Sequence, residues 1–264
     1  NKPYPKSNVI INPKKNSANN EANYLCAASL TYFFLDSLIK KTNSNFNINK
    51  YLVYVLLAIV CDVMPLRKIN KIIASYVIKN FKIKDNDALK SIFDQLGLNK
   101  KMTIDDLGYL IGPIINSGGR LGFPIYATDL LSTNNLKIIQ QRAAKLIKLN
   151  EKRKLLEKNI LDKIDYKKIK KKDKNVVIYY DTNINEGLIG IIAARLKDFY
   201  NKPSIVITKS INILKASARS TSNYNIGNLI KLLIDNKIIE KGGGHNMAAG
   251  FTIKKNKLKS LNEF

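Results

Sequence analysis

The amino-acid sequence predicts an α/β protein in which two lobes, joined by a long helix, surround a central cleft. Residues 134–165 contain neither glycine nor proline and repeat apolar residues at helical intervals, which predicts one long helix. Residues 176–250 alternate strand-like and helix-like segments, the pattern of an α/β lobe. The 264 residues are enough for two cores. We therefore expect domains over residues 1–132 and 169–264, with the connecting helix and a lysine-dense linker over residues 133–168.

The first lobe is predicted to be helical after one short strand at Val9–Ile11. A strongly apolar element is expected over residues 51–66, closed by Pro65. A capped helix is expected to begin at Thr103, with acidic residues in its first turn. The helices predicted in this lobe, from apolar spacing or from capping residues, cover residues 22–39, 68–81, 88–96 and 103–110.

Asp62 is a lone carboxylate near the end of that apolar element. Burying a carboxylate costs several kcal/mol unless the group is paired or bound to a metal. We therefore expect Asp62 to have a partner. A helix-end or turn cap and a metal ligand are the two interpretations.

Residues 112–122, GPIINSGGRLG, combine an amide, a hydroxyl, glycines and a guanidinium. We expect Asn116, Ser117 and Arg120 to converge on one flexible turn. An arginine offers a planar set of donors that suits phosphate, and glycines let the backbone approach it. The alternative is an ordinary Gly-Gly turn with a surface arginine.

The second lobe is predicted to alternate strands and helices. In the third strand Arg219 stands between two serines. The expected strands are 176–180, 204–208 and 214–220, and the expected helices are 187–200 and 226–234.

Residues 242–250, GGGHNMAAG, are predicted to form a glycine-rich loop around His245, the only histidine of the chain. Such a loop can take positive φ and hold a phosphate by its backbone N–H groups. We expect it to face the same groove as Arg219. A tight turn with a hydrogen-bonded histidine is the alternative.

The net charge of +25 favours polyanionic partners, although abundant Lys, Asn and Ile also fit an AT-rich genome. Cys26 and Cys61 lack metal-ligand spacing, so we expect a reduced, cytoplasmic chain without zinc. The longest apolar run, residues 51–63, is too short to span a membrane. Because the chain begins at Asn1 and not at Met, we expect an internal piece of a longer protein.

Six stretches carry a resemblance to a known family. They are CDVMPL at 61–66, GPIINSGGRLG at 112–122, NEKRKLLEKNIL at 150–161, EGLIGIIAARL at 186–196, KASARS at 215–220 and GGGHNMAAG at 242–250. Together they resemble the RecJ-type single-strand-specific DNA exonucleases of the DHH phosphoesterase superfamily. The resemblance covers nearly the whole chain, as the C-terminal part of a DHH domain followed by a DHHA1 domain. It places the first three DHH motifs before Asn1. Asn185 replaces the family's usual histidine, and Ala216 its frequent glycine.

The resemblance implies a metal-dependent 5′→3′ exodeoxyribonuclease of DNA repair and recombination. It implies a two-metal site for Mn²⁺ or Mg²⁺, with Asp62 as one ligand and the others outside this chain. Asn116 and Arg120 would act at the scissile phosphate. Single-stranded DNA is the implied substrate, with a single-strand-binding protein or a helicase as partners. The implied nucleic-acid-binding residues are Ser217, Arg219, Ser220, Gly243, Gly244, His245 and Asn246.

Two other functions stay open. One is a DHH-family phosphodiesterase on short oligoribonucleotides or cyclic dinucleotides, against which the long helix and residues 112–122 argue. The other is a non-catalytic single-strand-binding replication scaffold, against which Asp62 argues. By itself, this chain is expected to bind single strands weakly and to cleave nothing.

Overall fold

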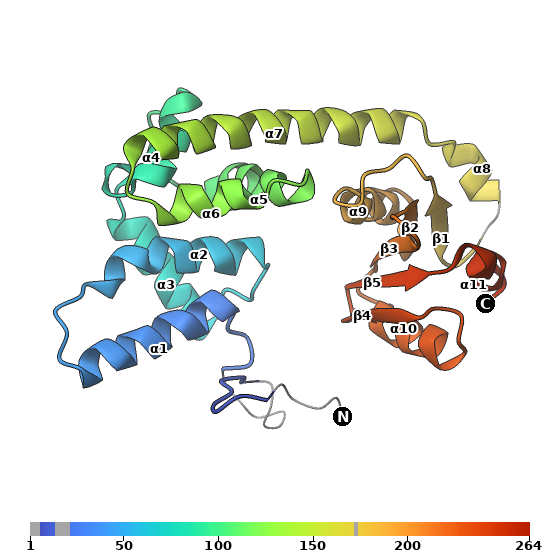
Figure 1. The fold of residues 1–264 in the computed structure, drawn as a ribbon, viewed down its shortest axis with the longest axis horizontal. Helices are drawn as coiled ribbons and strands as arrows, with labels where there is room; N and C mark the ends of the chain where they lie inside the picture. The colour runs from blue at the N-terminus through green and yellow to red at the C-terminus, as the bar shows by residue number, and fades with distance from the viewer. Residues whose placement is uncertain (1–5, 14–21, 172–173) are drawn as a thin grey trace. The chain divides into compact units, whose positions relative to one another are not determined.

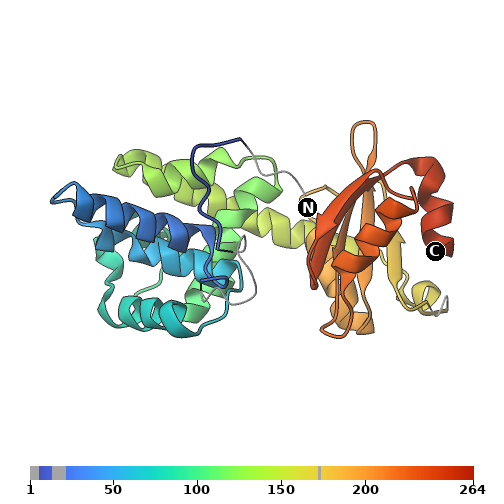
Figure 2. The ribbon, with the colours of Figure 1, turned by 90° about the horizontal axis from the view of Figure 1, so that it is seen from below.

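The computed structural model describes residues 6–13, 22–171 and 174–264. Within them the chain packs as two compact units. One is built from the chain up to Ile115 together with Asp129–Ala144, and the other from Asn116–Thr128 together with Lys145–Phe264. Figures 1 and 2 show helices in the blue and green part of the chain and all the strands in the yellow-to-red part. The predicted α/β class is confirmed, whereas the predicted domain boundaries stay a prediction.

The first unit is built around the apolar helix α2. Its residues are buried on nearly every side, as expected for a helix that is hydrophobic all round. It contacts α1, α3 and η3. The elements are α1 (Ala27–Lys41), η1 (Ile48–Tyr51), α2 (Leu52–Cys61), α3 (Lys68–Asn80), η2 (Ile83–Asp85), α4 (Asp87–Gln95) and the π-helical η3 (Asp106–Ile111). The helices predicted over residues 22–39, 68–81 and 88–96 are thus confirmed, the first with a later start.

The strand predicted at Val9–Ile11 is wrong. These residues are described and form no regular element, and Val9 and Ile11 are exposed. A strand is stable only when a neighbouring strand pairs with its backbone N–H and C=O groups. Residues 9–11 have no such neighbour among the described residues, so they do not form a strand.

Helices α5 (Gly112–Arg120), α6 (Ile125–Ser132) and α7 (Leu136–Asp162) follow. The long helix predicted from residue 134 is confirmed by α7. The flexible turn predicted over residues 112–122 is wrong, because residues up to Arg120 are helical. A Cβ added at Gly118 would lie 2.7 Å from the Phe123 carbonyl oxygen and 2.9 Å from a Leu146 methyl. This glycine therefore permits close packing and does not confer flexibility.

The second unit contains a five-stranded sheet in the order β1-β2-β3-β5-β4. The pair β1–β2 is parallel, and the other pairs are antiparallel. The parallel pair is joined through α9, as a βαβ unit requires. The elements are α8 (Tyr166–Lys171), β1 (Val177–Tyr180), α9 (Ile189–Tyr200), β2 (Ser204–Lys209), β3 (Leu214–Arg219), α10 (Ile226–Asp235), β4 (Lys241–Gly244), β5 (Ala248–Ile253), η4 (Lys255–Lys257) and α11 (Leu258–Glu263).

Both faces of the sheet are covered by helices. In β2, Val206 packs with the apolar residues of α9, whereas Ile205 and Ile207 pack with those of α10. In β3, Ala216 and Ala218 also belong to the α10 side. Since side chains alternate along a strand, Ser217 and Arg219 face α9.

Residues 166–171 form α8, whose Tyr166 ring centroid lies 4.6 Å from that of Phe199. The lysine-dense linker expected within residues 133–168 stays a prediction, and residues 172–173 lie outside the described residues.

One predicted loop is wrong. The glycine-rich loop at 242–250 is the hairpin β4–β5. In the described chain, only Gly97 and Gly122 are glycines with positive φ. A Cβ at Gly244 would lie 2.4 Å from that of Ala249, so glycine here allows close strand contact.

The capping predicted at Thr103 is present. The Asp106 carboxylate accepts hydrogen bonds from the Thr103 N–H (2.9 Å) and hydroxyl (2.8 Å) and from Lys100 Nζ (2.6 Å). The Asp106 N–H donates to Thr103 Oγ1 (3.2 Å), which completes a reciprocal capping arrangement. Burial alone would raise the pKa of Asp106, but the hydrogen bonds from Lys100 and Thr103 outweigh it and the pKa is lowered.

Because the pKa of Asp106 is lowered on folding, its contribution to stability is present above its ordinary pKa of 3.8 and is lost as the pH falls through the folded-state value. We expect Asp106→Asn to lower the free energy of unfolding by roughly 1–3 kcal/mol at pH 7. The difference from the wild type should shrink below pH 3.8. Urea unfolding at pH 7 and pH 3 measures both. The control is Asp105→Asn, which changes the exposed neighbour; equal losses in the two variants would contradict this role.

Candidate functional site

Arg120, the last residue of α5, is held by the turn that precedes α9. Its Nη1 donates to the Gly187 carbonyl oxygen (3.3 Å). The Gly187 N–H donates to Asn185 Oδ1 (2.9 Å), which closes the turn. A Cβ at Gly187 would lie only 2.0 Å from the Arg120 carbonyl oxygen. Only glycine therefore fits at position 187.

Arg219 and Ser217 lie on β3 against the first turn of α9. Arg219 Nη1 donates to Ser217 Oγ (3.1 Å) and to the Ala218 carbonyl oxygen (2.8 Å). A Cβ at Gly190 would lie 2.9 Å from Arg219 Nη2 and 3.2 Å from Ser217 Oγ. The glycines at 187 and 190 thus let two arginines approach the start of the same helix.

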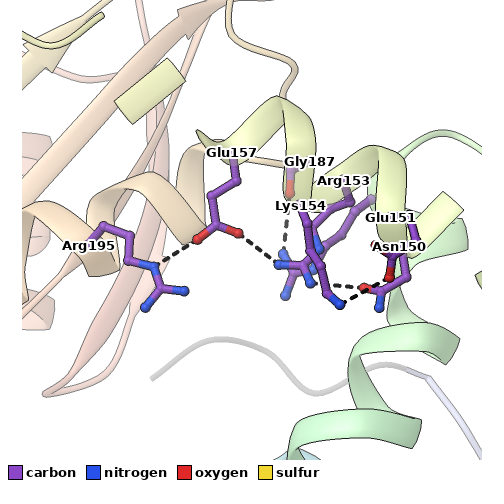
Figure 3. A network of polar contacts seen from close by, with 8 residues as sticks. Asn150, Glu151, Arg153, Lys154, Glu157, Gly187 and Arg195 are labelled. Carbon is purple, nitrogen blue, oxygen red and sulfur yellow. Dashed lines mark hydrogen bonds and ion pairs between the residues drawn. The ribbon is translucent and has the colours of Figure 1, made fainter. Parts of the chain in front are cut away.

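Arg153 and Glu157 of α7 complete the polar network, which Figure 3 shows together with Arg195 of α9. Glu157 is buried, and its carboxylate accepts from Arg153 Nη1 and from Arg195 Nε, both at 2.8 Å. Arg153 Nη2 also donates to Asn150 Oδ1 (2.9 Å). The Arg153 side chain, 13% exposed, is fixed on two sides.

We call Arg120, Arg153 and Arg219 the arginine cluster. Burial, then the charges of Arg153 and Arg219, lower the pKa of Arg120, and Glu157 opposes this. Burial also lowers the pKa of Arg219. A guanidinium nevertheless remains protonated in a protein. The cluster therefore concentrates like charges beside one carboxylate, and the N terminus of α9 adds partial positive charge. An anion with several oxygen acceptors, such as phosphate, would relieve this repulsion.

Other predicted binding residues gather at the turn of the β4–β5 hairpin. Gly243 and Gly244 lie on β4, where they pair with β5. His245 is exposed, and its Nδ1 accepts from the Met247 N–H (3.3 Å). The exposed Asn246 accepts the Ile226 N–H at its carbonyl (3.2 Å). The buried Ser220 hydroxyl donates to the Tyr224 carbonyl oxygen (2.7 Å) and so fixes the loop after β3.

The two remaining predicted residues, Asn116 and Asp62, are both exposed and lie in different units. Asn116 is exposed on α5, one turn before Arg120 and on the same helix face. Asp62 belongs to the first unit, where it is exposed and caps the C terminus of α2. The helix-end interpretation of Asp62 therefore describes its position, and its side chain is not the buried carboxylate that would need a partner, because the apolar run ends in a solvent-facing turn. Its role as a metal ligand stays a prediction.

The described residues do not form a metal site by themselves. No group of three or more His, Cys, Asp or Glu side chains converges among them. Asp62 could supply one carboxylate, whereas a divalent ion of the Mg²⁺ or Mn²⁺ type needs several oxygen ligands.

Four residues around the cluster were not predicted as site residues: Arg153, Glu157, Gly187 and Gly190. A signal was present for the first two, because Asn150, Arg153 and Glu157 follow at positions i, i+3 and i+7 of a helix and so share one face. For Gly187 and Gly190 no signal was present, because the sequence does not show which distant residues pack against a glycine.

Three comparisons with known proteins agree with the geometry. Residues 173–264 match the DHHA1 domain family. Over 270 residues the chain is 26% identical to the single-stranded-DNA-specific exonuclease RecJ of Haemophilus influenzae, covering 95% of this chain and 47% of that protein. The RecJ of Bacillus subtilis is 28% identical over 199 residues, covering 74% and 25%.

The fold is also similar to solved structures. RecJ from Thermus thermophilus in complex with Mn²⁺ matches with a TM-score of 0.81 at 20% identity, covering 95% of this chain and 37% of that one. The resemblance to RecJ exonucleases is thereby confirmed, and the chain spans less than half the length of these relatives. Across the part of the chain that the structure describes, no helix has the length and apolarity to cross a membrane.

We expect Gly187→Ala to lower the free energy of unfolding by roughly 1–3 kcal/mol, because the added methyl group meets the Arg120 backbone. It should also weaken anion binding by displacing Arg120. Urea unfolding and titration with a phosphorylated oligonucleotide measure the two effects. Gly119→Ala, on the same helix as Arg120 but with open space around the added methyl, should be neutral or stabilising by up to about 1 kcal/mol. Wild-type stability of Gly187→Ala would contradict the close contact.

Glu157→Gln should lower the free energy of unfolding by roughly 1–3 kcal/mol, because it leaves Arg153 and Arg195 without their shared carboxylate. Chemical denaturation at low salt measures the loss. Glu151→Gln is the matched control on the same helix. Its exposed pair with Lys154 (3.0 Å) should contribute less than about 0.5 kcal/mol. Similar losses in both variants would show that burial of Glu157 adds nothing.

Proposed function

We propose that the arginine cluster binds backbone phosphates of single-stranded DNA, in a chain that is part of a metal-dependent exonuclease. The observation that carries the proposal is that Arg120 and Arg219 lie against the start of α9, where the positive charge of Arg153 also acts on Arg120. The buried carboxylate of Glu157 pairs with Arg153 and offsets only part of this charge. The RecJ relatives are single-stranded-DNA-specific exonucleases by name. A role in DNA repair and recombination rests on this resemblance alone.

Each cluster residue has a distinct task in the proposal. Arg120 contacts the phosphate at or beside the bond to be cleaved, where its charge stabilises negative charge that develops during hydrolysis. Asn116, one turn earlier on the same helix face, orients that phosphate. Arg219 and Ser217 hold a neighbouring phosphate against the N terminus of α9. Backbone contacts of this kind give little sequence preference and a strong dependence on salt.

The relatives' structures solved with Mn²⁺ and Mg²⁺ support divalent metal use in the family. A bound pair of such ions would activate the attacking water and neutralise phosphate charge. Asp62 would contribute one ligand in the native protein. The part played by the described residues is to bind and orient the strand.

The test uses the native protein that contains this chain, with Mn²⁺ and single-stranded DNA labelled at either end. Arg219→Gln should weaken binding about tenfold for every sequence and reduce the slope of log affinity against log salt by about 1. Asp62→Ala should abolish cleavage while binding persists. Lys259→Gln removes an equal charge from an exposed site on α11 and should behave as the wild type.

Three outcomes would contradict the proposal. Cleavage and binding unchanged in both Arg219→Gln and Asp62→Ala would remove the proposed site. Hydrolysis of a dinucleotide but not of longer DNA would indicate the phosphodiesterase class. Binding without cleavage in the wild type would indicate a scaffold.

A further inference from the structure

Phe123 and Tyr126 form a stacked aromatic pair shortly after Arg120. Their ring centroids are 5.3 Å apart and the rings are within 10° of parallel. Lys145 Nζ lies 5.2 Å from the centre of the Tyr126 ring, a cation–π distance. Phe123 is 44% exposed, whereas Tyr126 is half-buried. The pair therefore presents a supported aromatic ring to solvent.

The backbone fixes Phe123 beside the arginine cluster. Its N–H donates to the Gly118 carbonyl oxygen (2.7 Å), and its own carbonyl packs where Gly118 has no side chain. Phe123 follows Arg120 by three residues, so their Cα atoms lie at most roughly 11 Å apart. A strand with a phosphate at Arg120 would therefore have its neighbouring bases within reach of this ring.

The geometry distinguishes this pair from Phe199, another exposed aromatic of the second unit. Phe199 is 65% exposed, but its ring is tilted by 49° against Tyr166 and packs edge-on to Tyr200. It also lies ten residues along α9 from Ile189, roughly 15 Å from the start of the helix. A single exposed aromatic needs no explanation. A parallel pair with a cation, next to a phosphate-binding arginine, fits a base-stacking platform.

We propose that Phe123 stacks on a nucleobase of the single strand whose phosphate is held at Arg120. The ligand chemistry is a flat, unpaired base, and the platform does not read base identity, because every base has a π-face. The pre-stacked Tyr126 holds the ring in place, so little side-chain entropy is lost on binding. This inference rests on the proposed function.

The first test exploits the absence of tryptophan from the chain. In the 264-residue chain, Phe123→Trp introduces one fluorophore at the platform, and Phe199→Trp introduces one elsewhere in the same unit. Titration with an oligothymidylate of about 12 nucleotides, long enough for one binding site, should quench the emission of the Phe123→Trp variant, because stacking on a base quenches indole emission. An abasic strand of equal length and charge should not quench it. No quenching of Phe123→Trp by saturating oligothymidylate would overturn the proposal, as would equal quenching in Phe199→Trp.

The second test separates base contact from phosphate contact by fluorescence anisotropy. Phe123→Leu keeps apolar volume but not the aromatic face. It should weaken binding of oligothymidylate about 5- to 10-fold and leave binding of the abasic strand unchanged. Phe199→Leu is the control. A parallel titration with oligouridylate distinguishes DNA from RNA as the source of the base. A loss of affinity in Phe123→Leu for either base-bearing strand, without a loss for the abasic strand, supports stacking. Unchanged binding of both strands by Phe123→Leu would overturn it.

Arg120→Ala distinguishes failure of this inference from failure of the proposed function. It should weaken binding of base-bearing and abasic strands alike. If both strands bind Arg120→Ala as they bind the wild type, the proposed phosphate site fails. The quenching measured in Phe123→Trp then still reports on the platform by itself.

Discussion

The buried carboxylate of Glu157 is the interaction on which the charged surface of the second unit depends. It accepts from arginines of two different helices, α7 and α9, at equal distances. Without a negative charge there, the arginine cluster would consist of cations repelling one another in a partly desolvated place. The carboxylate neutralises only part of that charge. Burial, and then the positive charge that remains, lower the pKa of Arg120, and that charge favours an anion from solution.

Glycines determine where the arginines lie. Gly187 allows the turn before α9 to touch the backbone of Arg120, and Gly190 leaves room for Arg219 and Ser217 against the helix. Gly118 has the same effect at Phe123. In each case a neighbouring group occupies the space that a side chain would take. These glycines therefore matter because they let two parts of the chain come close together. The hairpin glycines follow the same logic at Ala249.

Much of the fold could be predicted from the sequence, because periodicity reports on local structure. The long helix α7, strands β1 to β3 and helices α9 and α10 follow directly from apolar spacing. The glycine-rich stretches were interpreted wrongly as loops. Composition does not distinguish a glycine required for a positive φ from one required because a neighbouring group leaves no space for a side chain. Asp62 was expected to need a partner for a similar reason, because the hydrophobic run gave no sign of where the chain turns to solvent. Arg120 and Arg219 were predicted as site residues, but their meeting at α9 depends on tertiary contacts that no spacing encodes.

The division of the chain also bears on how such a site can be inherited. The segment that matches the DHHA1 family begins at residue 173. It contains Arg219, but Arg120, Arg153 and Glu157 lie upstream on α5 and α7. A recombination event that transferred only the family-matched segment would carry the sheet and one arginine of the cluster, and would leave behind the partners that concentrate the charge. The arginine cluster is thus a property of the continuous gene segment from α5 onward, and the DHHA1 module is not by itself a unit of exchange for it.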